Sequence, residues 1–253
     1  MDPSLGAAVL AFGKLAFAAA GLAAGAHVLR AARGSADLGV HALAAVAIAS
    51  GSLALFLFPL ARALPGATAP EVVSGAGEVA IRLAFALLAV FVWRVFRPES
   101  RAAALAVVGY GVLLLATFAW DLRAQPSLAF YDATLASAWA AQLSFTLLFA
   151  WSCADATLEW RRARRRVALG LGDRIVAHRF ALWAIATGAL AWAALLANAV
   201  AFARTRGLPA VEGTLLLVRG LLYLPAVAAV WLGIFQPSWY RRALGDRLAS
   251  PAG

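Results

Sequence analysis

Long apolar stretches alternate with short polar ones along the whole chain. Seven of the apolar stretches hold about 20 or more residues, the length that an α-helix needs to cross the hydrocarbon of a bilayer. Turn-forming and charged segments separate them, such as RPES at 97–100 and GLGDR at 170–174. The pattern predicts transmembrane helices over residues 5–29, 38–61, 72–96, 102–122, 133–158, 180–203 and 213–235.

The predicted fold is all-α: a polytopic membrane protein whose residues 1–253 form a single seven-helix bundle. The first apolar stretch lacks the positive segment that opens a secretory signal, and Lys14 interrupts it. We therefore expect this stretch to be retained as the first helix rather than cleaved. Residues 237–253 are expected to form a short cytoplasmic tail.

The composition agrees with this prediction. Hydrophobic residues make up 64% of the chain and charged residues only 13%, whereas soluble domains are about 45–50% apolar and about 25% charged. All but one of the 22 basic residues are arginines, the exception being Lys14. Alanine is also abundant. This usage indicates GC-rich codons and hence a bacterium, which would place the protein in the inner (plasma) membrane.

The distribution of arginine predicts the orientation of the bundle. Seven helices leave 15 arginines at one set of helix ends and 4 at the other. Basic loops stay in the cytoplasm, so the N-terminus is expected outside and the C-terminus inside. The 4 outer arginines are Arg62, Arg123, Arg204 and Arg206. The formal net charge is +10, but most arginines flank apolar segments rather than forming one solvated face, so we do not expect binding to nucleic acid.

Several ionisable residues fall within the predicted helices. Glu78 and Arg82 are one turn apart in the third helix, and Arg82 is expected about 15 Å below its outer end. Arg219 has a similar depth in the seventh helix, and Lys14 in the first. Because charge in lipid is costly, such side chains normally face the bundle interior and mark functional sites.

These residues predict one central polar site in the outer half of the bundle. Its excess of positive charge would favour a small anionic ligand, held by arginine side chains that can form two parallel hydrogen bonds. The alternative is a structural ion network that binds nothing. The candidate ligand-binding residues are Glu78, Arg82, Arg219, Lys14, Asp121, Gln142, Asn198 and Tyr223.

The predicted topology, with seven helices and an outer N-terminus, resembles that of microbial rhodopsins and G-protein-coupled receptors. The likeness is one of topology only. A retinal protein needs a lysine in its seventh helix, where LLVRGLLYLP carries Arg219 instead, and the receptor motif NPxxY is missing. We therefore transfer no functional residues from either family.

Other chemistry is weakly represented. His27, His41 and His178 lie near predicted cytoplasmic ends, which is typical of interfacial residues, and a single cysteine, Cys153, cannot form a disulfide within the chain. Asp155 is expected to be solvated or paired with the arginines that follow it. We predict no metal, no cofactor and no catalytic residues, so an enzyme is the least favoured class.

The most basic segment joins the fifth and sixth helices, at residues 160–179. Orientation and anionic lipid headgroups account for it, but it could also bind an acidic cytoplasmic protein. We favour a receptor-like sensor of a small ligand that signals through such a partner. The alternatives are a small-solute transporter or channel, which needs a polar path across the bundle, and a structural or assembly subunit.

Overall fold

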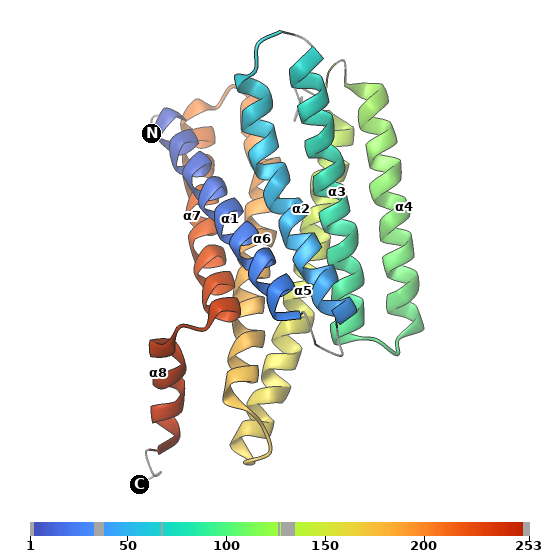
Figure 1. Ribbon diagram of the computed structural model, residues 1–253. Helices are drawn as coiled ribbons and strands as arrows, with labels where there is room; N and C mark the ends of the chain where they lie inside the picture. Colours follow the sequence, from blue (N-terminus) through green and yellow to red (C-terminus); the bar gives the residue numbers. More distant parts are fainter. Residues whose placement is uncertain (1–2, 33–37, 67, 126, 128–134, 250–253) are drawn as a thin grey trace.

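The computed structural model describes residues 3–32, 38–66, 68–125, 127 and 135–249. All regular secondary structure of these residues is α-helical. Seven long helices are followed by a short one (Figure 1): α1 (Pro3–Ala32), α2 (Leu38–Ala63), α3 (Thr68–Phe96), α4 (Arg101–Ala124), α5 (Ala136–Ala168), α6 (Arg174–Thr205), α7 (Pro209–Phe235) and α8 (Ser238–Ala249).

The long helices begin and end within about four residues of the bounds predicted from the apolar stretches, with three differences. Helix α6 begins at Arg174 rather than at 180. The fifth helix continues to Ala168 rather than ending at 158, because EWRRARRR consists of good helix formers that need no lipid around them. The segment predicted as a tail contains α8. The first two residues predicted for the fifth helix, 133 and 134, lie outside the described part of the chain.

Six helices, α1 to α4, α6 and α7, are long and apolar enough to cross a membrane, which indicates a multi-pass membrane protein. The described residues of α5 include no comparably apolar stretch. Its polar side chains lie on one face instead: Ser137, Ser144 and Ser152, spaced by seven and eight residues, are all buried. The polar character of α5 is therefore directed into the bundle.

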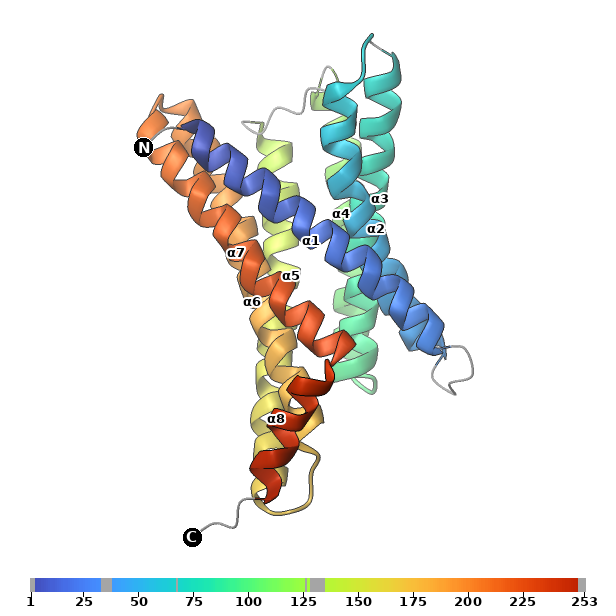
Figure 2. The same ribbon diagram turned by 60° about the vertical axis from the view of Figure 1, so that its left-hand side comes forward.

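The helices are arranged as a ring with α4 on its outside (Figures 1 and 2). Helix α1 packs against α2 and α7, α2 against α3, and α6 against α5 and α7. The ring closes where α3 meets α5, through Phe85 and Phe145, whose rings stack with centroids 4.1 Å apart. Among the described residues, helix α4 packs mainly against α3 and α5, and apolar side chains such as Leu105 and Leu115 stay exposed on it.

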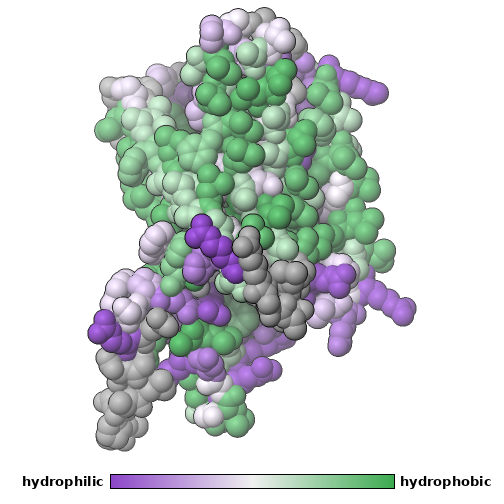
Figure 3. Space-filling view, viewed as in Figure 1, coloured by the Kyte–Doolittle hydropathy of each residue, from purple (hydrophilic) through white to green (hydrophobic). Residues whose placement is uncertain are grey.

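The two ends of the bundle differ in charge. We call the end that holds the start of α1 and the α2–α3 and α6–α7 turns the N-terminal end, and the opposite end the basic end. Figure 3 shows hydrophobic side chains over the middle of the visible face and hydrophilic ones gathered toward the basic end. The arginines of α5 beyond Trp160, from Arg161 to Arg166, are exposed there.

Glycines allow α1 and α7 to approach closely. A Cβ atom built on Gly13 would lie 2.6 Å from the carbonyl oxygen of Gly220, and one built on Gly220 would lie 2.7 Å from the amide nitrogen of Leu10. Close backbone contact of this kind is a common basis of helix association in membranes. The contact fixes Gly13 and Gly220 at the same level of the bundle.

Replacement of Gly220 by alanine should therefore destabilise the protein. Its new methyl group would meet backbone atoms of α1 that cannot move aside, and overpacking of this kind typically costs about 1–3 kcal/mol. The matched control is Gly111→Ala in α4, where a Cβ meets nothing within 4 Å and the higher helix propensity of alanine favours the helix. Thermal unfolding in detergent, followed by tryptophan fluorescence, should show a lower midpoint for Gly220→Ala alone. Equal midpoints for the two variants would contradict the close contact.

Candidate ligand-binding site

Arg82 joins two carboxyl groups from neighbouring helices. It lies halfway along α3, and its Nη1 atom donates a hydrogen bond to Glu78 Oε2, one turn earlier in the same helix. Its Nη2 atom donates to Asp121 Oδ2 of α4 at 2.6 Å. The guanidinium carbon also lies 4.6 Å from the ring centroid of Phe118 in α4. We call Glu78, Arg82 and Asp121 the α3–α4 charge cluster.

The α3–α4 charge cluster is closed to its surroundings. Glu78 is 8% exposed, Arg82 is 7% exposed and Asp121 is 1% exposed. Salt bridges as enclosed as these bring opposite charges together at a high desolvation cost, and removal of one partner leaves the other charge buried and unpaired. The cluster thus holds α4 to α3 but presents no open surface to a ligand from solution.

Lys14 and Arg219 lie on the sides of α1 and α7 that face the core. Leu10, four residues before Lys14, belongs to a buried cluster against which Phe17 packs, three residues after Lys14. Leu215 and Leu222, one turn on either side of Arg219, pack against the same cluster. Since residues three or four apart share a helix face, both basic side chains leave their helices on the side that faces the bundle interior. We call them the α1–α7 cationic pair.

The α1–α7 contact places the two cations at the same level. Lys14 follows Gly13 and Arg219 precedes Gly220, the glycines whose backbones meet. Both side chains are half-buried, at a depth of about 15 Å from the N-terminal ends of their helices. Tyr223 lies beside them: it is buried in the same core cluster, and its ring centroid is 5.8 Å from that of Phe17.

The positive charge of this pair is not neutralised by the described residues. Neither Lys14 nor Arg219 forms an ion pair within the described part of the chain, and the charged groups near Lys14 are the cations Arg219 and Arg62. The Nε atom of Arg219 is buried and has no hydrogen-bond partner among the described residues. The acidic residue nearest to Arg219 along α7 is Glu212, which binds Arg204 at 2.6 Å instead.

Gln142 and Asn198 belong to neither group. Asn198 is buried, and it lines an apolar groove between α5 and α6 with Trp139 and Leu195. Gln142 is half-buried in α5, and its main-chain carbonyl accepts a hydrogen bond from Thr146.

The eight candidate residues are therefore divided among separate places, whereas the sequence predicted one central site. Asp121 and Glu78 bind Arg82 where α3 meets α4, and Tyr223 accompanies the α1–α7 cationic pair. The division follows from the helix contacts, because α3 packs against α2, α4 and α5, and α7 packs against α1 and α6. Their separation leaves the acidic groups on one side and the unneutralised cations on the other.

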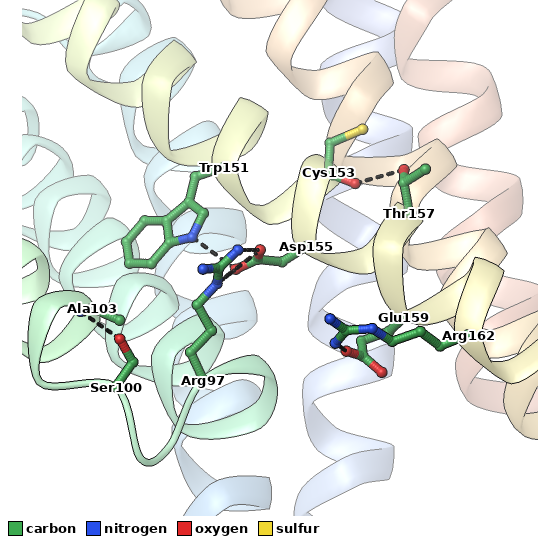
Figure 4. Close-up of polar contacts among 9 residues, drawn as sticks. All are labelled: Arg97, Ser100, Ala103, Trp151, Cys153, Asp155, Thr157, Glu159 and Arg162. Atoms are coloured by element: carbon green, nitrogen blue, oxygen red, sulfur yellow. Dashed lines mark hydrogen bonds and ion pairs between the residues drawn. The ribbon is translucent and has the colours of Figure 1, made fainter.

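A second polar site, at the basic end, was not identified from the sequence (Figure 4). Asp155 of α5 is 96% enclosed, and both of its oxygens accept hydrogen bonds from Arg97, which follows α3, at 2.6–3.0 Å. The indole Nε1 of Trp151 donates to Asp155 Oδ2 at 2.8 Å. The hydrogen bonds and negative charge of Asp155 raise the pKa of Arg97, which keeps this guanidinium protonated.

Asp155 was expected to be solvated or to pair with the arginines that follow it in the chain. It is instead enclosed, and its partner Arg97 is 58 residues away. Glu159 does pair with a following arginine, Arg162. These two ion pairs border a cavity of about 170 Å³, which Phe96 and Leu158 complete. Since each arginine there already has its carboxylate, the cavity carries no unpaired charge.

The histidines form no shared site among the described residues. His27 packs against Phe235, with ring centroids 4.9 Å apart, and His178 against Tyr240 at 6.4 Å. The side chain of His41 lies outside the described part of the chain.

Comparison with protein-family models, curated proteins and solved structures gives no match for this chain. Its chemistry is therefore inferred from the charges and contacts above.

The Arg82→Gln substitution should be strongly destabilising. It would leave two enclosed carboxyl groups without their cation, and the loss of one partner of a buried ion pair costs about 3–5 kcal/mol. The control is Arg204→Gln, which breaks the pair with Glu212 at the protein surface, where Arg204 is 56% exposed; exposed pairs contribute less than about 1 kcal/mol. Unfolding midpoints in detergent would compare the variants. If Arg82→Gln were as mild as Arg204→Gln, the cluster would not hold α3 and α4 together.

Proposed function

We propose that this protein is a membrane sensor that binds a small anion at the α1–α7 cationic pair. The observation that supports the proposal is the unneutralised positive charge of Lys14 and Arg219 at one level of an apolar bundle. Enclosed cations without acidic partners are costly, and an anionic ligand would supply the missing charge. A carboxylate or phosphate fits because the arginine head can donate two parallel hydrogen bonds to either group.

The proposal keeps the topology predicted from the sequence. Helix α5 would be the seventh spanning helix, because it runs beside α6 along the bundle and buries its serines inside it. The basic end would face the cytoplasm of a bacterial cell, since basic residues are retained on that side. The N-terminal end, and with it the approach to Lys14 and Arg219, would then face outward.

Sensing is favoured over transport by the residues that follow the cationic pair toward the basic end. Many of the buried positions there are small and apolar, such as Ala18 and Ala24 in α1 and Ala226 and Ala229 in α7. A transporter needs a polar path across the bundle, and the described buried polar groups next to these positions are limited to neutral hydroxyls such as those of Tyr223 and Ser52. An anion that entered from the N-terminal end would stop at Lys14 and Arg219.

The binding signal would be passed on by the basic extension, the segment at residues 160–179 where α5 ends and α6 begins. Beyond Asp155, α5 continues for 13 residues, to Ala168, which at 1.5 Å per residue is about 20 Å. The exposed arginines on this extension suit an acidic cytoplasmic protein. Helix α6, which carries the second half of the extension, also packs against α7, so a ligand beside Arg219 would act on a helix that contacts the readout.

Anion binding should stabilise the folded protein. Purified protein in detergent would be titrated with inorganic phosphate and with succinate, and unfolding midpoints recorded at constant ionic strength. A ligand at 100 times its dissociation constant stabilises by about 2.7 kcal/mol, so the midpoint should rise for at least one anion. Lys14→Gln and Arg219→Gln should abolish the rise.

The matched control is Arg206→Gln, which removes an exposed positive charge at the same end of the bundle and should leave the rise intact. Stabilisation that persists in both Lys14→Gln and Arg219→Gln, or that is lost in Arg206→Gln as well, would contradict a site at the α1–α7 cationic pair. Uptake of the same anion into proteoliposomes would favour transport over sensing.

A further inference from the structure

The α3–α4 charge cluster contains more acidic than basic groups. Two carboxyl groups, of Glu78 and Asp121, share one guanidinium, that of Arg82. With both carboxyl groups ionised, the cluster would carry a net charge of −1 in an enclosed, apolar setting. Such an unbalanced charge is expensive to bury, and the cost falls if one carboxyl group takes up a cation.

No other described cation forms an ion pair with Glu78 or Asp121. Helix α2, which packs against α3, carries Arg62 in its last turn. On α3, the neighbouring charged residue beyond Glu78 is the acidic Glu71, two turns away. Helix α5, also packed against α4, has its first charged residue at Asp155, which holds Arg97 at the basic end. On α4 itself, Arg123 is exposed while Asp121 is buried. The compensating charge must therefore be taken up within the cluster.

A proton fits this place better than a metal ion. Hard metal cations are held by about six or more oxygen ligands, whereas the two carboxyl groups offer four oxygens, of which two already accept hydrogen bonds from Arg82. The hydroxyl of Thr117, one turn from Asp121, is occupied as well, because it donates to the carbonyl of Leu114 at 3.1 Å.

Asp121 is the better candidate for the proton. Its Oδ1 atom is buried without a hydrogen-bond partner, and the residue is only 1% exposed. Glu78 is the more exposed carboxyl of the two, and it lies one turn from Arg82 on the same helix. A buried polar group without a partner costs far less as a neutral acid than as a charged carboxylate.

We propose that Asp121 is a proton-binding site, with Glu78 as the counter-ion of Arg82. The proton resides on Asp121 Oδ1, and Asp121 Oδ2 accepts the hydrogen bond from Arg82 Nη2. Loss of the proton leaves a net negative charge between α3 and α4. Because α4 packs mainly against α3 and α5 within the described part of the chain, the proton helps to keep α4 in place.

Infrared spectroscopy tests this assignment independently of any ligand. Protein in lipid nanodiscs at neutral pH should show the carbonyl stretch of a protonated carboxyl group, and this band should shift when the aspartates carry a 13C carboxyl label. Asp121→Asn should remove the band, since asparagine resembles a neutral acid and keeps the cluster balanced. Glu78→Gln should remove it too, because Asp121 then becomes the counter-ion of Arg82.

The control Asp155→Asn should leave the band unchanged. Absence of the band at neutral pH, a band that the aspartate label does not shift, or a band that survives Asp121→Asn would each overturn the proposal. If either variant failed to fold, the label experiment in the Asp155→Asn background would still decide the outcome, because Asp121 is then the one enclosed aspartate among the described residues.

Discussion

Charge inside an apolar bundle has to be balanced by groups that the bundle itself, or a ligand, provides. This constraint distinguishes three groups of charged residues by how well their charges are balanced. At the basic end, Asp155 and Arg97 balance one another. Between α3 and α4, the single guanidinium of Arg82 pairs with two carboxyl groups. Between α1 and α7, Lys14 and Arg219 lie together and pair with no acidic residue of the described part of the chain. The proposed anion and proton would restore the balance at the last two places.

The packing of the helices determines which charges can meet. Backbone contact at Gly13 and Gly220 fixes the level at which α1 crosses α7, and this brings two repelling side chains to one place. Glycines thereby permit a costly arrangement that looser packing would relieve. Helix α4, by contrast, packs loosely on the outside of the ring, and a charge cluster joins it to α3. The α1–α7 contact is tightly packed and holds cations without counter-ions. The α3–α4 contact is weakly packed and is held by ion pairs.

The sequence was sufficient to predict the helices, because an apolar stretch of about 20 residues has few other structures open to it. It also identified Glu78 and Arg82 as partners, since they are one turn apart on one helix. Contacts between helices were harder to predict from the sequence, because the partners are far apart in it. Asp121 is 39 residues from Arg82, and Asp155 is 58 residues from Arg97. Periodicity gives the face of a helix on which a residue lies, but not the helix that this face meets. The end of α5 was missed because its arginines favour a helix without being apolar.

The proposed positive site of Lys14 and Arg219 should be reached from the N-terminal end of the bundle. Thiol labelling of a Lys14→Cys variant, with the native Cys153 changed to serine, measures both its accessibility and its charge. An anionic, membrane-impermeant thiol reagent applied outside intact cells should label position 14 faster than a cationic reagent of similar size, and Arg219→Gln should remove the difference. Failure of external labelling, or equal rates for the two reagents, would rule out such a site.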